Sequence, residues 1–459
     1  MSTVRTRWYH ELNSYHWFVL TVAALGWLFD CLDQQLFNLA RRPAMTELLA
    51  STPGAHVDIS VINAYSGYAT SIFLLGWATG GLTFGVLGDR IGRARTMLWT
   101  ILLYSAFTGL SALSVGFWDF AAYRFLTGLG VGGEFAVGVS LVAEVMPERA
   151  RPFALGLLQA LSAIGNITAA LLNIGLGTLE ERGVFHDWTW NGQPIHVWRI
   201  MFVIGVLPAL LAVVIRRGLR EPEAWQAAAH DKGTERKLGS YTALFSDPRW
   251  ARNAIVGLVL ASSGIVGLWG IGFFSTDLIQ SVFRKTFEAQ GMPEEQISGQ
   301  LKVWSGISFM MLNVGAFFGV GAFTYITHFV GRRLAFAVSF VAAGLSTAMV
   351  FLFLDTPSEI FWMIPLMGFC LLALFGGYAI YFPELFPTYL RSTGTSFCYN
   401  VGRYVAALGP SALGMLSSGV FKDELEPLRL SGVTLCSVFL IGLLALPFAP
   451  ETKGQPLPE

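Results

Sequence analysis

The sequence predicts an all-α membrane protein with twelve transmembrane helices, arranged as two six-helix halves that repeat one another. Of the 459 residues, 54% are hydrophobic and only 13% are charged, about half the charged share of a typical soluble protein. Many apolar runs reach the ~18 residues that span a bilayer as a helix. A third observation, an internal repeat, predicts the two halves. The formal net charge is zero, so the composition gives no indication of nucleic-acid binding.

Apolar runs predict the individual spans. They cover 17–40, 61–86, 96–116, 119–145, 153–178, 197–215, 253–283, 302–327, 334–354, 359–383, 393–420 and 431–449. Glycines interrupt most of these runs, as in GWATGGLTFGVLG at 76–88. In lipid, small residues let helix backbones approach closely, so we expect glycine to serve helix packing. No cleavage site follows the first run, and we expect that helix to be retained.

Lysines and arginines orient the spans. They gather before span 1 and after each even-numbered span, as with Arg90, Arg93 and Arg95 after span 2. The positive-inside rule then places both termini in the cytoplasm, and we expect a monomer in the plasma (inner) membrane, surrounded by lipid. Residues 217–251 form the one long polar stretch. We expect a cytoplasmic linker there, between an N-terminal half at 1–216 and a C-terminal half at 252–459.

Several patterns exclude other functions. The four cysteines lie in apolar runs and the seven histidines are scattered, so neither set predicts a metal site. A G-x-G-x-x-G pattern begins at Gly128, but it lies inside a membrane span with no strand before it, so we expect no dinucleotide cofactor. The sequence has no Walker loop and no nucleophile–base arrangement. We therefore expect neither a cofactor nor an enzyme.

An internal repeat links the two halves. The pattern E-x-x-P-x-x-x-R begins at Glu144 and again at Glu384, so Arg151 and Arg391 are also 240 residues apart. A Gly-Arg pair ending at Arg93 has its counterpart 239 residues later. Two repeated six-helix halves with a site at their interface are the architecture of a transporter.

These motifs resemble those of the major facilitator superfamily over essentially the whole chain. The loop GVLGDRIGRAR at 85–95 is similar to that family's signature between spans 2 and 3. RFLTGLG at 124–130, the two E-x-x-P-x-x-x-R copies and PETKG at 450–454 resemble its sugar-porter and organic-acid branches. The resemblance implies alternating-access transport. In the second copy of the loop signature, His328 stands where Asp89 stands in the first.

Charged residues at the cytoplasmic helix ends predict a conformational latch between the halves, because charge networks there can form in one conformation and break in another. The alternative is that the arginines only anchor helix ends at lipid head groups. Because His328 replaces Asp89 in the second copy, a matching latch on the C-terminal side is in doubt. The predicted latch residues are Asp89, Arg93, Glu144, Arg151, Glu384 and Arg391.

Two aspartates in span 1 need buried partners. Asp30 and Asp33 are three residues apart and share a helix face. A rise of ~1.5 Å per residue puts Asp33 roughly 24 Å above the cytoplasmic end and Arg124 about 7 Å below the outer end, at similar depth. The resemblance to proton-coupled sugar porters implies that this pair couples protons. Its separation in a dry cavity would favour the protonated acid. A structural ion pair remains the alternative, and Asp30 is either a packing residue or a second proton site.

Span 11 carries a second arginine, Arg403, roughly 15 Å from the cytoplasmic end. No carboxylate in that span can neutralise it, and an unpaired cation at this depth usually faces a water-filled cavity. Guanidinium binds carboxylates in a bidentate fashion, so Arg403 predicts an anionic substrate, unless it pairs structurally with a distant acid such as Glu134. The other predicted substrate-binding residues are Asn400, Tyr399, Gln34, Gln159, Tyr378 and Trp269, with Asn166 and Asn313 as weaker candidates.

The sequence therefore predicts proton-coupled symport of a small organic anion, such as a monocarboxylate, sugar acid or aromatic acid. The first alternative is proton-coupled symport of a neutral sugar or polyol. A non-transporting sensor on the same fold is a remote alternative.

Overall fold

The computed structural model describes residues 8–50, 57–182, 184–185, 188–190, 193–230, 237–272, 275–406 and 415–459. The described residues are helical almost throughout, which confirms the predicted all-α class. A small hairpin is the exception, in which β1 (Thr189–Trp190) pairs antiparallel with β2 (Gln193–Pro194). It lies in the loop between two predicted spans and leaves the helical architecture unchanged.

A first helix group contains the predicted spans 1 to 6. It comprises η1 (Trp8–Glu11), α1 (Ser14–Leu48), α2 (Ile59–Ile91), α3 (Arg93–Ser111), α4 (Phe117–Val145), α5 (Arg151–Glu181), α6 (Val197–Ile204) and α7 (Ala209–Gly218). The predicted sixth span is divided into α6 and α7 beside Pro208, because proline has no N–H to donate to the preceding turn. Two short helices follow in the predicted linker, α8 (Glu223–His230) and α9 (Tyr241–Ser246).

A second helix group contains the predicted spans 7 to 12. It comprises α10 (Pro248–Ile265), η2 (Val266–Ile271), α11 (Ser275–Ala289), α12 (Glu294–Val330), α13 (Arg332–Phe353), η4 (Pro357–Glu359), α14 (Ile360–Glu384), η5 (Thr388–Leu390), α15 (Arg391–Ala406), η6 (Leu416–Val420), α17 (Pro427–Leu435), α18 (Val438–Ala445) and η7 (Leu446–Phe448). The predicted start of span 8 was eight residues late, since α12 already begins at Glu294.

Ten helices among the described residues are long and apolar enough to cross a membrane. The predicted spans 96–116 and 393–420 account for the other two. The first corresponds to α3, which has 19 residues and begins with two arginines in its first three positions. The second begins with α15, but its residues 407–414 lie outside the described part of the chain. The twelve-helix prediction is consistent with this arrangement.

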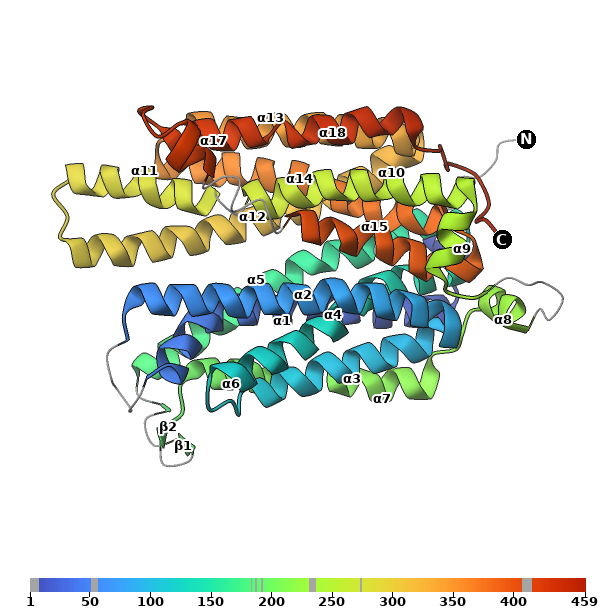
Figure 1. The fold of residues 1–459 in the computed structure, drawn as a ribbon, viewed down its shortest axis with the longest axis horizontal. Helices are drawn as coiled ribbons and strands as arrows, with labels where there is room; N and C mark the ends of the chain where they lie inside the picture. Colours follow the sequence, from blue (N-terminus) through green and yellow to red (C-terminus); the bar gives the residue numbers. More distant parts are fainter. Residues whose placement is uncertain are drawn as a thin grey trace.

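Figure 1 shows the two helix groups side by side, with the first group in blue to green and the second in yellow to red. The C-terminus, α8 and α9 lie at the same end of the molecule, which we call the terminal face. Helix α5 contacts α12 and helix α2 contacts α15 across the boundary between the groups. These contacts position the cavity described below.

Glycines allow the closest helix contacts in both groups, as the sequence predicts. A Cβ on Gly132 of α4 would overlap the carbonyl oxygen of Trp77 in α2. In the second group, a Cβ on Gly319 of α12 would overlap the carbonyl oxygen of Phe369 in α14. The same pair of helices in each group thus packs backbone to backbone, which is the arrangement small residues allow in lipid.

Candidate functional site

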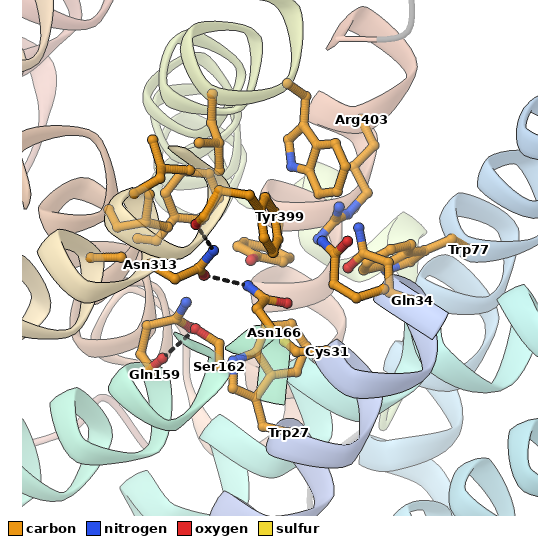
Figure 2. A pocket seen from close by; sticks show the side chains of 18 residues that line it. Trp27, Cys31, Gln34, Trp77, Gln159, Ser162, Asn166, Asn313, Tyr399 and Arg403 are labelled. Carbon is orange, nitrogen blue, oxygen red and sulfur yellow. Dashed lines mark hydrogen bonds between the residues drawn. The ribbon is translucent and has the colours of Figure 1, made fainter. Parts of the chain in front are cut away.

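A cavity lies between the two helix groups, with an empty volume of about 620 Å³ that includes space open to solvent. Helices from both groups contribute its walls, so it lies where the repeat architecture predicts a substrate site. Most of the lining is aromatic or amide-bearing (Figure 2). The lining residues are Trp27, Cys31, Gln34, Gln35, Trp77, Gln159, Ser162, Asn166, Leu268, Trp269, Phe309, Leu312, Asn313, Ala316, Leu372, Phe375, Tyr399 and Arg403.

Arg403 is the only charged residue among those that line the cavity. Its guanidinium carbon lies 3.9 Å from the ring centroid of Trp77 and 4.8 Å from that of Tyr399. Aromatic faces stabilise a guanidinium without using its N–H groups. Its Nε has no hydrogen-bond partner among the described residues. The arginine is therefore held in place with donors left for a ligand.

The other predicted substrate-binding residues divide into two sets. Gln34, Gln159, Trp269 and Tyr399 line the cavity with Arg403, and Figure 2 shows Gln34 beside the guanidinium. Asn400 and Tyr378 do not line it, which corrects the prediction for both.

Both corrections have a structural reason. The Asn400 amide donates to the carbonyl of Ser396 at 3.2 Å and to that of Gly132 at 3.4 Å, so it serves the contact between α15 and α4. The Tyr378 hydroxyl donates to the carbonyl of Leu260 at 2.7 Å. Asn400 is three residues before Arg403, so the two side chains are neighbours on the surface of α15. Asn400 nevertheless points at α4, whereas Arg403 points into the cavity.

Two asparagines that were weaker sequence candidates also line the cavity. The Asn166 amide on α5 donates to the Asn313 carbonyl oxygen on α12 at 2.8 Å, which joins the two helix groups (Figure 2). A polar residue in an apolar run was the signal for both. The sequence did not indicate that Trp77 and Trp27 line the cavity, because tryptophan in a membrane span also occurs in lipid contacts and in helix packing.

Asp33 and Arg124 lie together, as predicted. Both side chains are fully buried, and Nη1 of Arg124 is 3.9 Å from Oδ2 of Asp33. The other carboxylate oxygen accepts a hydrogen bond from Thr108 at 2.7 Å. Arg124 also donates to the hydroxyls of Ser111 and Thr127 at 2.7 and 2.9 Å. Since the two facing atoms have no hydrogen-bond partner among the described residues, the pair is close but not tightly bonded.

Asp30, the second aspartate of α1, is 1% exposed. Neither of its carboxylate oxygens has a hydrogen-bond partner among the described residues. An ionised carboxylate in that position would be costly. The surroundings of Asp30 are taken up again below.

At the terminal face, Asp89 joins the two helix groups. It is fully buried and accepts hydrogen bonds from the backbone N–H groups of Ser392 and Thr393 at 3.1 and 2.8 Å. The Thr393 hydroxyl adds a third at 2.6 Å. A carboxylate of the first group thus caps the N-terminus of α15 in the second, where the helix dipole favours a negative charge.

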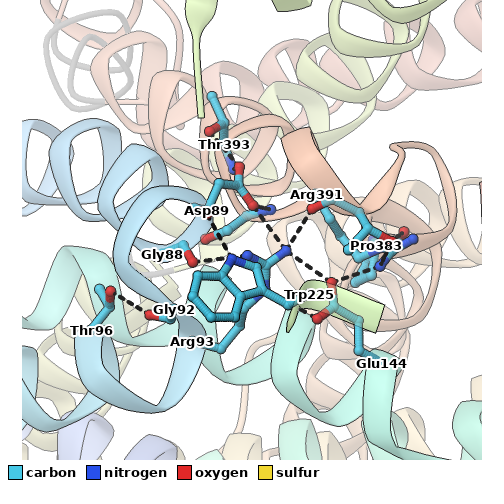
Figure 3. Close-up of polar contacts among 12 residues, drawn as sticks. Gly88, Asp89, Gly92, Arg93, Thr96, Glu144, Trp225, Pro383, Arg391 and Thr393 are labelled. Atoms are coloured by element: carbon cyan, nitrogen blue, oxygen red, sulfur yellow. Dashed lines mark hydrogen bonds and ion pairs between the residues drawn. The ribbon is translucent and has the colours of Figure 1, made fainter. Parts of the chain in front are cut away.

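Arg93 and Glu144 extend this junction (Figure 3). Arg93 is 3.0 Å from Asp89 and 2.9 Å from Glu144, and it donates to the carbonyl of Thr388 at 2.6 Å. Glu144 in turn accepts from Arg391 of the second group at 2.6 Å. Four of the predicted latch residues therefore form one buried network across the boundary.

The second group carries a related arrangement. Arg332 binds Glu384 through two hydrogen bonds of 3.0 and 2.8 Å, as Arg93 binds Glu144. Glu384 is therefore paired within its own group. Arg151, the remaining predicted latch residue, donates to the carbonyl of Ala143 at 2.8 Å. Glu144, the first residue of the same motif, is paired with Arg93 and Arg391.

Acidic side chains also cap the helices that follow the signature loops. Glu451 accepts from the backbone N–H groups of Arg332 and Arg333 at 2.9 and 3.1 Å, and Glu221 accepts from those of Ala94 and Arg95 at 3.2 and 3.0 Å. Burial by itself raises the pKa of Glu451, but these backbone hydrogen bonds bring it below its ordinary value.

Comparison with known proteins agrees with this geometry. The cis,cis-muconate transport protein of Acinetobacter baylyi is 28% identical and aligns with 88% of this chain and 89% of its own. The sialic acid transporter NanX of Escherichia coli is 26% identical, with 86% of each chain covered. The proton:xylose symporter XylE has the same fold, with a TM-score of 0.68, 17% identity and coverage of 97% of this chain and 98% of its own.

The family follows from the extent of the sequence match. The profile of the Major Facilitator Superfamily matches residues 23–410, most of the chain. The chain therefore belongs to the Major Facilitator Superfamily and is a membrane transporter.

Proposed function

We propose that the protein is a symporter that couples protons to a small organic anion, such as a monocarboxylate, a sugar acid or an aromatic acid. Arg403 carries this proposal, because it is the only charged residue among the described residues that line the cavity. A guanidinium binds a carboxylate through two parallel hydrogen bonds. The muconate and sialic acid transporters named above carry carboxylates by name, which supports the same substrate class.

The proposed proton site is Asp33 with Arg124. The ion pair is long, at 3.9 Å, and lies in a fully buried environment where an unpaired charge is costly. A proton on Asp33 would release Arg124 to its other acceptors, Ser111 and Thr127. Protonation would therefore leave the Arg124 charge with neutral acceptors only, and this change can alter the structure of the first helix group.

The proposed cycle moves residues 1–216 against residues 252–459, with 217–251 as a cytoplasmic linker. If the terminal face is cytoplasmic, as the positive-inside rule indicates, the network of Asp89, Arg93, Glu144 and Arg391 closes that side. The conformation described here then faces outward. Breaking this network would open the cavity to the cytoplasm. We place the transporter in the inner membrane and expect it to work as a monomer.

A neutral sugar or polyol is the second candidate substrate. The fold similarity to a xylose symporter and the Asp33–Arg124 pair favour it. It gives no reason for a cation stacked between Trp77 and Tyr399 in the cavity.

Proton movement in proteoliposomes tests the proposal. We expect cis,cis-muconate or sialic acid, added outside, to make the external medium more alkaline as a proton enters with each anion. Arg403→Ala should weaken the response about 10- to 100-fold, since a hydrogen bond to a charged group is worth about 1.5–3 kcal/mol. Asp33→Asn should reduce proton movement but keep anion exchange. Arg284→Ala is the control, because this side chain of α11 is 42% exposed and does not line the cavity.

Two results would contradict the proposal. A response to xylose with none to either carboxylate would favour the neutral-sugar alternative. Uptake of either carboxylate without proton movement would remove the coupling and leave Asp33–Arg124 as a structural pair.

A further inference from the structure

The buried face of the first helix group holds a third carboxyl group that the mechanism above does not use. Glu134 on α4 is 1% exposed. Its Oε2 accepts a hydrogen bond from Thr100 at 2.7 Å, while its Oε1 has no partner among the described residues. That second oxygen lies where a Cβ on Gly26 of α1 would overlap it. Gly26 is one helical turn before Asp30, so both carboxyl groups occupy the same side of α1.

Asp30 and Glu134 form what we call the acid pair. Among the described residues, the charged and titratable groups that interact with it are Asp33 and Cys31 of α1, Tyr104 of α3 and Arg403 of α15. Asp30 interacts electrostatically with Glu134 and with Asp33, its neighbour on α1. Tyr104 of α3 is fully buried, its hydroxyl has no partner among the described residues, and it interacts with all three acids. Arg403 of α15 approaches from the second helix group and also interacts with Asp30.

The acid pair lies directly behind the cavity wall. Cys31, which follows Asp30, lines the cavity, and so does Tyr399. Phe135, which follows Glu134, stacks on Tyr399 with ring centroids 4.0 Å apart. Tyr399 in turn contacts the Arg403 guanidinium. Only a thin layer of side chains therefore separates the acid pair from the predicted anion site.

The charges around the acid pair do not balance if both acids are ionised. Arg124 neutralises Asp33, which leaves Arg403 as the cation that interacts with Asp30. Two carboxylates in one buried site cannot both ionise at low cost, so we expect one of the two to carry a proton. When a substrate carboxylate binds Arg403, it adds a negative charge beside the remaining ionised acid. That acid then becomes easier to protonate.

We propose that Asp30 and Glu134 form a second proton site, which takes up a proton when an anion binds Arg403 and releases it when the anion leaves. The proton comes from water and forms an O–H bond on whichever of the two carboxylates is ionised; no other bond changes. Because binding linkage is reciprocal, protonation of the pair also strengthens anion binding. This inference rests on the proposed function, since it requires an anionic substrate at Arg403.

Proton uptake on anion binding tests the acid pair directly. cis,cis-Muconate and sialic acid are titrated into weakly buffered, detergent-purified protein, while a pH dye counts protons and calorimetry counts bound anion. In the wild type we expect a proton to be taken up with each anion, and the affinity to rise as the pH is lowered. Glu134→Gln keeps the shape of the side chain and its acceptor for Thr100. We expect this variant still to bind the anion, but with less proton uptake. The effect of pH on its anion affinity should be reduced about tenfold, since coupling between two sites typically changes an affinity 5- to 150-fold.

Two further variants separate protonation from structure. Glu134→Asp retains an acid and should restore proton uptake in part, which a purely structural role would not predict. Asp119→Asn, on the same helix but away from the acid pair, should behave as the wild type. Proton uptake in Glu134→Gln equal to that of the wild type would overturn this inference alone. Failure of the wild-type protein to bind either carboxylate would overturn the proposed function, and this inference with it.

Discussion

The two helix groups share their charged junctions at the terminal face but differ in the charges they bury near the cavity. Arg93–Glu144 in the first group repeats as Arg332–Glu384 in the second. The first group alone places Asp30, Asp33 and Arg124 in its buried interior, whereas the second contributes Arg403. Repeated contacts thus maintain the shared fold, and the unrepeated charges provide the asymmetry that coupled transport requires.

The junction itself differs at one position. Asp89 caps the N-terminus of α15 across the boundary between the groups. Its counterpart His328 lies against the ring of Phe153, with centroids 5.5 Å apart. Asp89 thus caps a helix of the other group, whereas His328 makes an aromatic contact. We therefore expect the contact at Asp89 to hold the two groups together more strongly than the contact at His328.

The largest expected effect is on the repeated ion pairs. Arg93→Ala removes one buried partner from both Asp89 and Glu144, and breaking a buried pair costs about 3–5 kcal/mol. Arg332→Ala should also destabilise the fold, but less, because it removes the partner of Glu384 alone, and Glu384 keeps a hydrogen bond from Thr452. Melting temperatures of the purified variants in detergent measure the difference. Equal losses would show that the two copies are equivalent and would break the comparison.

A smaller effect is expected on the balance between conformations. Asp89→Asn removes the charge that caps α15, and a hydrogen bond to a charged group is worth about 1.5–3 kcal/mol. We expect the terminal face to open more often, measured as faster labelling of a cysteine introduced at Ser396, which is buried beneath this junction. His328→Asn is the matched control and should leave the labelling rate unchanged. Faster labelling in the control variant would mean that both sides latch.

The smallest effect concerns pH and the cap on α13. Because hydrogen bonding holds the pKa of Glu451 below its ordinary value, the ionised cap stabilises the fold above the pKa of the unfolded chain. That stabilisation is lost as the pH falls through the lower pKa of the folded state. The melting temperature of Glu451→Gln should therefore fall less steeply on acidification than that of the wild type. Parallel curves would exclude a contribution from this carboxylate.

Much of the candidate site was predictable because it depends on depth along helices of known rise. Asp33 and Arg124 were paired from their distances to opposite membrane surfaces, and Arg403 was expected in a cavity because its span has no acid. Assignments that depend on which neighbouring helix a side chain meets were predicted less well. Asn400 was placed on the cavity by its spacing from Arg403, and Tyr378 as an aromatic residue of span 10, but each hydrogen bonds to a backbone carbonyl of an adjacent helix.

The sequence by itself determined the membrane class, the repeated halves, the family resemblance and the buried charges that need partners. These follow from composition and periodicity, which reflect the cost of exposing polar groups to lipid. Only the tertiary structure decided which partners those charges have. Glu144 binds Arg93 and Arg391, and Glu134 lies against Gly26, one helical turn from Asp30. These residues meet because of how each helix is rotated about its axis and of the angle at which it crosses its neighbours. The spacing of residues along a single helix specifies neither the rotation nor the crossing angle.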